Sequence, residues 1–186
     1  MKKIQELRAR ARTVRPWRNG GGVTRDIVQF PAEAGDETFV WRASVATIGA
    51  AGPFSAWPGL DRTLMLLSGQ LVIAIDGAAE RCLGRGDAAI AFAGEAAVAA
   101  RPIGGECTVF NIMVRRGRAK ARLERWTAAR DTDANQVLLV AEVATTIRFP
   151  DRSINLDKHD ALLLGHAEVA ALESNRPVIV AEMLGR

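Results

Sequence analysis

Two arginines, Arg42 and Arg62, are the side chains of this sequence whose type and setting point most clearly to chemistry. Each stands beside a segment rich in Gly, Pro, Trp and Phe, which suits loops and strand ends better than a core. A guanidinium keeps its charge near neutral pH and matches a carboxylate through two parallel N–H groups. The pair therefore predicts a site for a small anion, in which a charge-assisted hydrogen bond contributes roughly 1.5–3 kcal/mol.

Polar and aromatic residues close to these arginines in the sequence would complete the site. In the run from Phe39 to Ala46, strand alternation puts Arg42 and Ser44 on the same face. The glycine-rich run Asn19–Gly22 leaves its backbone free to approach a ligand. We expect hydrogen bonds to the ligand from Asn19, Gly20, Ser44 and Asp61, and a pocket wall made of Phe54 and Trp57.

Each of these features also has a purely structural interpretation. Asn19–Gly22 suits a tight turn, and it lacks the Lys-Ser/Thr pair and the following helix of a phosphate-binding loop. The aromatic residues suit core and rim packing, and the arginines suit a solvated surface. The co-occurrence of Arg-x-Ser on one strand, glycine-rich backbone and a second arginine favours a small-molecule pocket over these alternatives.

Length, composition and charge limit the class of protein. The chain has 186 residues, of which 48% are hydrophobic and 25% charged, as expected for a globular protein with a core. A formal net charge of +4 is too small to indicate nucleic-acid binding by itself. No apolar run reaches the length of a signal peptide or a membrane span. We therefore expect a cytoplasmic protein without a membrane partner.

Metal and disulfide chemistry have little support in the sequence. The two cysteines, Cys82 and Cys107, are far apart and form no CxxC pair, which is typical of reduced thiols. The two histidines, His159 and His166, lie in the second half of the chain, away from the arginines. We expect these histidines to be ordinary side chains, and we expect no metal and no other cofactor.

Short apolar or alternating runs, separated by Gly, Pro, Asp and Asn, predict an all-β fold with few short helices. Two such runs, 63–67 and 70–76, flank Ser68-Gly69 and predict a tight hairpin there. The polar, basic stretch from Arg115 to Gln136 is interpreted as a connector. Beyond it, apolar runs recur at the spacing of runs in the first half, which hints at a duplicated β unit.

Ordered motifs between Pro16 and Gly117 resemble the HutD/Ves family. They are Pro16-Trp-Arg-Asn-Gly-Gly-Gly-Val-Thr, Phe39-x-Trp-Arg-x-Ser, Gly52-Pro-Phe-Ser, Pro58-Gly-x-Asp-Arg, Phe92-x-Gly-Glu and Phe110-Asn-x-Met-x-Arg-Arg-Gly. The resemblance implies a cupin fold, a double-stranded β-helix or jelly-roll barrel, duplicated as a bicupin. Residues 1–117 would form the N-terminal cupin half with the pocket, and residues 118–186 a connector and a degenerate C-terminal half, packed as one compact unit.

The metal-binding pattern of cupins is altered in this sequence. Cupins that bind a metal use G-x5-H-x-H-x3,4-E-x6-G followed by G-x5-P-x-G-x2-H-x3-N. With Gly69 as the last glycine of the first motif, Arg62 stands at the glutamate position. With Gly86 as the first glycine of the second motif, Ala97 stands at the histidine position. Because neither residue ligates a metal, the resemblance implies a metal-free cupin.

The HutD/Ves resemblance also implies a role in bacterial histidine utilisation, whose intermediates include small carboxylates. Our leading hypothesis is a metal-independent cupin that binds such a carboxylate and regulates the pathway. The alternative is an enzyme of isomerase or hydrolase type, with Asp61 or Glu95 as acid or base. Nucleic-acid binding by Arg115–Arg125 is less favoured, because no helix-turn-helix or aromatic RNA motif accompanies it. Analogy with other cupins makes a homodimer a further expectation.

Overall fold

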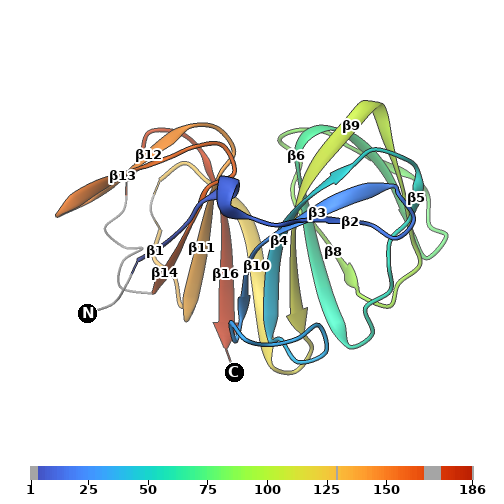
Figure 1. Ribbon diagram of the computed structural model, residues 1–186, viewed down its shortest axis with the longest axis horizontal. Coiled ribbons are helices and arrows are strands. Elements are labelled where there is room, and N and C mark those ends of the chain that lie inside the picture. The colour runs from blue at the N-terminus through green and yellow to red at the C-terminus, as the bar shows by residue number, and fades with distance from the viewer. Residues whose placement is uncertain (1–3, 129, 166–172, 186) are drawn as a thin grey trace. The chain divides into compact units, whose positions relative to one another are not determined.

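The chain folds into two compact units made almost entirely of β-strands (Figure 1). A computed structural model describes residues 4–128, 130–165 and 173–185. One unit spans Thr13–Arg116, and the other combines the segment up to Arg12 with the segment from Gly117 onward. The short 3-10 helix Ala9–Ala11 is the only helix in the described residues, which therefore contain no helix able to cross a membrane. The prediction of an all-β fold with few short helices is confirmed.

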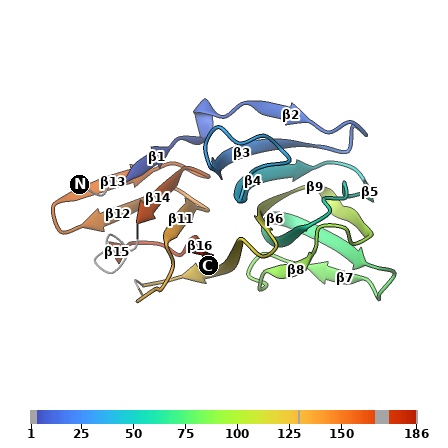
Figure 2. The same ribbon diagram turned by 90° about the horizontal axis from the view of Figure 1, so that it is seen from below.

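The unit Thr13–Arg116 is built from the antiparallel strands of one sheet. Their hydrogen-bonded order is β2-β3-β4-β9-β6-β7, with β5 paired to β9 and β8 paired to β6 (Figure 2). The strands are β2 (Val14–Pro16), β3 (Gly22–Phe30), β4 (Trp41–Ile48), β5 (Gly52–Pro53), β6 (Leu60–Ile75), β7 (Arg81–Leu83), β8 (Ile90–Ala93) and β9 (Val98–Arg115). Among the described strands, this path runs from β2 to β7 without joining its ends, so the jelly roll is not closed by hydrogen bonds into a barrel.

Two long strands, β6 and β9, pair with each other along most of their length at the centre of this sheet. The predicted hairpin at Ser68-Gly69 is wrong, because both flanking runs belong to β6. Gly69 instead lies where the register of β6 against β9 shifts, and such irregularities bend a strand. Its φ is +79°, and an added Cβ would lie 2.8 Å from the Cβ of Cys107. The glycine signal that suggested a turn therefore marks a bend within one strand.

The core of this unit lies on the inner face of the sheet. Strand alternation sends apolar side chains inward from β4, β6, β8 and β9, among them Ile48, Leu66, Ile90 and Val109. This packing fixes the register of the strands, because a slip by one residue would move these side chains to the opposite face of the sheet. The same register determines where polar residues of β4, β6 and β9 meet.

The second unit contains a five-stranded sheet, β1-β14-β11-β16-β10, and a three-stranded sheet, β13-β12-β15. The strands are β1 (Gln5–Leu7), β10 (Ala119–Trp126), β11 (Gln136–Ala141), β12 (Thr145–Phe149), β13 (Arg152–Leu156), β14 (Ala161–Gly165), β15 (Glu173–Ser174) and β16 (Val178–Gly185). The interpretation of Arg115–Gln136 as a connector is wrong for Ala119–Trp126, which pairs with β16. This strand ends the order of the five-stranded sheet, and charged residues on such a strand obscure its apolar pattern.

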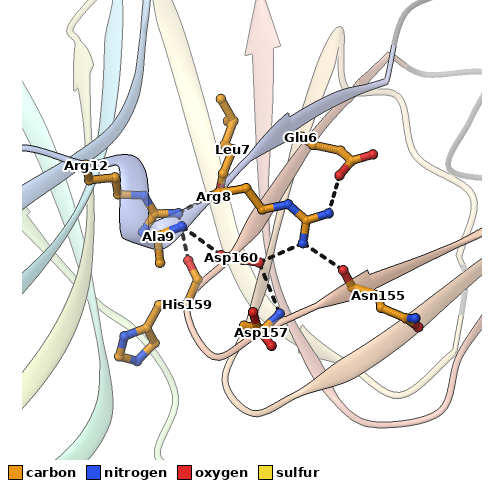
Figure 3. A network of polar contacts seen from close by, with 9 residues as sticks. All are labelled: Glu6, Leu7, Arg8, Ala9, Arg12, Asn155, Asp157, His159 and Asp160. Atoms are coloured by element: carbon orange, nitrogen blue, oxygen red, sulfur yellow. Dashed lines mark hydrogen bonds and ion pairs between the residues drawn. The ribbon is translucent and has the colours of Figure 1, made fainter.

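Asp160 binds the N-terminal segment of this second unit through hydrogen bonds from Arg8 and Ala9 (Figure 3). Its buried carboxylate accepts hydrogen bonds from the backbone N–H of Ala9 (2.7 Å), the guanidinium of Arg8 (2.8 Å) and the backbone N–H of Asp157 (3.1 Å). Burial opposes ionisation of the carboxyl, but these donors together hold the pKa of Asp160 below its usual range. Because β1 also pairs with β14, the first described residues are part of this unit's sheet.

Candidate functional site

Three neighbouring strands bring polar residues together on the inner face of the unit Thr13–Arg116. In the register of β4, β9 and β6, Arg42, Met113 and Arg62 lie directly opposite one another. Ser44 and Asn111 form the next row. Opposed side chains point to the same side of a sheet, and neighbouring strands are about 4.8 Å apart. The Cα atoms of the two arginines are therefore about 10 Å apart, with Met113 between them.

These rows form part of the lining of a cavity of about 710 Å³. Its other walls come from residues 15–19, from the loop between β3 and β4, and from the loop between β5 and β6. Six of the eight predicted site residues line this cavity: Asn19, Arg42, Ser44, Phe54, Trp57 and Arg62. As strand alternation predicts, Arg42 and Ser44 lie on the same face.

Arg42 is a buried cation, with only 5% of its surface exposed. Its guanidinium carbon lies 4.8 Å from the ring centroids of Phe39 and of Trp57. One terminal nitrogen, Nη1, donates a hydrogen bond to Oδ1 of Asp36 at 2.5 Å. Its Nε is buried and has no hydrogen-bond partner in the described residues. The two rings and one carboxylate thus compensate a charge that burial would otherwise oppose.

Arg62 is held by neutral groups only. Its terminal nitrogens donate to the backbone carbonyl of Ser55 and to Oδ1 of Asn111, each at 3.3 Å. Its guanidinium carbon lies 5.2 Å from the ring centroid of Phe54 and 5.1 Å from that of Phe92. The buried Nε has no hydrogen-bond partner among the residues that the structure describes.

The electrostatic surroundings of Arg62 oppose its positive charge. Burial, and then the positive charge of Arg42, lower the pKa of Arg62 to about 10. Within the described part of the chain, no acidic side chain forms an ion pair with this guanidinium. An anion bound against the terminal nitrogens of Arg62 would supply the missing negative charge.

Gly94 fixes the loop that carries Phe54 and Trp57. The backbone N–H of Trp57 donates to the carbonyl of Gly94, and the N–H of Gly94 donates to the carbonyl of Leu60, both at 2.7 Å. An added Cβ at Gly94 would lie 2.2 Å from the carbonyl oxygen of Trp57. Glycine at position 94 therefore permits a close approach to the backbone of Trp57 and Leu60. This contact positions the wall of the cavity that Phe54 and Trp57 form.

The glycine-rich run Asn19–Gly22 forms a turn, and it also contributes a residue to the lining of the cavity. Oδ1 of Asn19 accepts a hydrogen bond from the N–H of Gly21 at 3.0 Å, so this residue shapes a turn while it also lines the cavity. Gly20 lies in the same turn, with φ at +69°, but it does not line the cavity. Its predicted hydrogen bond to a ligand stays a prediction without support from this geometry.

Asp61 and Glu95, the acid or base residues of the enzyme hypothesis, do not line the cavity either. Both are paired with Arg116, each at 2.9 Å, and the side chains of all three are about half exposed. The side-chain hydrogen bond from Arg116 lowers the pKa of Glu95. The three residues form a surface ion cluster, and a carboxyl with a lowered pKa is a weaker base.

Asn111 and Asp36 are among the polar residues of the cavity that are absent from the predicted site. Asn111 is buried and interrupts the apolar run Val109–Val114, and a polar residue inside a buried strand is a usable signal. Asp36 lies in a loop that also contains Glu33 and Glu37. Nothing in the sequence distinguishes it from these other acids.

The lining of the cavity does not suit a metal ion. Its charged side chains include the buried guanidinium of Arg42 and the partly buried guanidinium of Arg62. Asp36, the one carboxylate among the described lining residues, is paired with Arg42. Cations bind to imidazole, thiolate or carboxylate groups, and positive charge repels them. No group of three or more His, Cys, Asp or Glu side chains converges anywhere in the described residues. His159 lies in the other unit, and His166 lies outside the described residues.

Comparison with known proteins identifies a matching family and relatives with similar sequences. The family model HutD matches residues 9–180. A relative from Pseudomonas putida, described as an uncharacterized 21.2 kDa protein in the hutC 3′ region, is 32% identical over 189 residues, which cover 100% of this chain and 95% of the relative. Protein Ves from Cronobacter sakazakii is 38% identical over 108 residues, which cover 58% of each chain.

Solved structures of a HutD protein and of a cupin resemble this chain. The structure of HutD from Pseudomonas fluorescens SBW25 matches with a TM-score of 0.83 and 29% identity, over 99% of this chain and 100% of that chain. A cupin 2 conserved barrel domain protein from Leptotrichia buccalis matches with a TM-score of 0.55 and 9% identity, over 89% of each chain, which shows the cupin fold alone. Because the family model covers most of the sequence, this chain belongs to the HutD family.

Proposed function

We propose that this protein binds a small carboxylate in the cavity of its unit Thr13–Arg116 and regulates histidine utilisation through that binding. The observation that carries the proposal is Arg62, a partly buried guanidinium in the cavity whose hydrogen-bond partners among the described residues are neutral. A carboxylate oxygen accepts strong hydrogen bonds from a guanidinium and supplies the opposite charge. Arg62 is therefore the primary anchor of the ligand, and Asn111 orients it.

The rest of the cavity suits a small, partly apolar acid. Ser44 and Asn111 supply polar atoms beside the arginines, while Leu64 and Val109 supply apolar floor. Trp57 and Phe54 form the wall, as the predicted site has them. A cavity that combines apolar lining with a few convergent polar groups is the usual form of a small-molecule site.

The relatives support the link to histidine utilisation. The Pseudomonas putida relative, which is 32% identical, is named for a place in the hutC 3′ region. We extend the proposal to a cytoplasmic regulator that senses a carboxylate intermediate of histidine breakdown.

Catalysis is the less favoured function. The two candidate acids or bases, Asp61 and Glu95, are tied to Arg116 outside the cavity. The carboxylate that does line it, Asp36, is paired with Arg42. General acid–base catalysis needs a group within hydrogen-bond reach of the reacting atom, so the enzyme hypothesis lacks a placed base.

A thermal-shift screen tests the proposal directly. The protein would be heated with urocanate, formiminoglutamate, N-formylglutamate and simple aliphatic acids, with the corresponding amides as controls. An acid present at 100 times its dissociation constant stabilises the folded state by about 2.7 kcal/mol, so a clear rise in Tm is expected for at least one acid and not for its amide. Equal shifts with acids and amides, or no shift with any acid, would contradict carboxylate recognition.

A further inference from the structure

Asp36 is the only acidic side chain among the described residues that line the cavity. It lies in the loop between β3 and β4, and its side chain is 58% exposed, whereas that of its partner Arg42 is 6% exposed. The loop is tied to the sheet on both sides of Asp36. The side chain of Gln29 donates to the carbonyl of Ala32 at 3.1 Å, and the guanidinium of Arg115 donates to the carbonyl of Glu37 at 2.7 Å.

Asp36 pairs with Arg42 and not with Arg62, so the two arginines have different roles. Arg42 already has a carboxylate at hydrogen-bond distance, and Arg62 has none among the described residues. The two guanidiniums and one carboxylate therefore leave a formal charge of +1 on the inner part of the cavity. At the rim, Arg15 pairs with the carboxylate of Asp26, and Arg18 is exposed, so solvent and salt screen its charge.

We propose that Asp36 is a specificity-determining residue that restricts the cavity to ligands with one carboxylate, which binds to Arg62. A second carboxylate on the same ligand would meet Arg42 with its hydrogen-bonding partner already in place. It would then face the negative charge of Asp36, which lies at hydrogen-bond distance from the same guanidinium. The inference rests on the proposed carboxylate binding and adds that the number of negative charges on the ligand is selected.

Butyrate and succinate are suitable probes, because they share a four-carbon skeleton and differ by one carboxylate. Calorimetric titration of both acids into the wild-type protein, Asp36→Asn and Asp61→Asn would measure the selection. Asp61→Asn is the matched control, because its side chain is 51% exposed, pairs with an arginine and does not line the cavity. Both substitutions remove one negative charge, so any effect of net charge is the same.

The wild-type protein should bind butyrate at least tenfold more tightly than succinate. Asp36→Asn should reduce this ratio tenfold or more, mainly by tightening the binding of succinate, while Asp61→Asn should keep the wild-type ratio. An unchanged ratio in Asp36→Asn, or an equal loss of affinity for both acids, would overturn the inference, because Asp36 would then only position Arg42. If neither acid nor any other carboxylate binds the wild-type protein, the proposed function itself fails.

A second measurement needs no variant and so does not depend on the folding of one. Monomethyl succinate keeps the skeleton of succinate but carries one negative charge. The wild-type protein should bind this monoester at least tenfold more tightly than succinate. Tighter binding of succinate would overturn the inference even if carboxylate binding itself is established.

Discussion

Arg42 and Arg62 face one cavity from opposite sides of Met113, but in the described part of the chain only Arg42 has an acidic partner. The positive charge of Arg42 adds to the effect of burial in lowering the pKa of Arg62. Two rings and two neutral hydrogen-bond acceptors compensate the charge of Arg62 only in part. The position of Arg62 is therefore consistent with a site that an anionic ligand completes.

Replacement of Asn111 tests the group that orients Arg62. Asn111→Leu removes the oxygen that accepts from the guanidinium at 3.3 Å, while a side chain of similar size keeps the buried position filled. We expect the affinity for a small carboxylate to fall about tenfold, or about 1.4 kcal/mol, by calorimetry. The free energy of unfolding, measured by denaturant titration, should change much less than after removal of an apolar core residue. Undiminished affinity would show that Arg62 needs no orientation by Asn111.

The bend in β6 gives a prediction about stability. Gly69→Ala forces an L-residue into φ +79° and places its Cβ 2.8 Å from a backbone oxygen and from the Cβ of Cys107. Gly104→Ala is the matched control, because its φ is +71° but nothing lies within 4 Å of the added Cβ. The conformational penalty of about 1–2 kcal/mol should appear in both variants. Denaturant unfolding should show a larger loss for Gly69→Ala, and equal losses would mean that the strand shifts freely at the bend.

The anchor at Asp160 predicts a pH dependence of stability. Asp160→Asn should lower the free energy of unfolding at pH 7 by about 1–3 kcal/mol, because donors around a buried carboxylate lose part of their acceptor. Since the folded-state pKa of Asp160 lies below its usual range, its contribution is fully present above the unfolded-state value of about 3.9. It is lost as the pH falls through the lower folded-state pKa.

The stability difference between the wild-type protein and Asp160→Asn should therefore shrink below about pH 4. Urea unfolding at several pH values between 3 and 7 would measure it, with Asp157→Asn as control, because the Asp157 side chain is exposed and only its backbone N–H contacts Asp160. A difference that stays constant down to pH 3 would mean that the pKa of Asp160 is the same in the folded and unfolded states.

Most of the fold and a large part of the site follow from the sequence. Strand alternation predicts that Arg42 and Ser44 share a face, and the motif spacing groups the loops that carry Asn19, Phe54 and Trp57. The all-β class follows from short apolar runs between turn residues. These features are local, and local patterns are what a sequence displays directly.

The features that the sequence does not predict depend on partners distant in the chain. Gly69 predicts a turn by type, but pairing with β9 on both sides of it makes one bent strand. Asp61 stands next to Arg62 in sequence, yet alternation turns it to the opposite face, where it pairs with Arg116. Asp36 enters the cavity from a loop whose course is fixed by Gln29 and Arg115, and no local pattern reports that.

Calorimetric titration of butyrate into Arg62→Met measures how much Arg62 contributes to carboxylate binding. Methionine keeps much of the length and apolar surface of the arginine stem but has no charge and no N–H donor. Arg116→Met is the control, because it removes one arginine charge outside the cavity. We expect a loss of about 10- to 100-fold in affinity for Arg62→Met and wild-type affinity for Arg116→Met. Wild-type affinity in a folded Arg62→Met protein would show that Arg62 does not anchor the carboxylate.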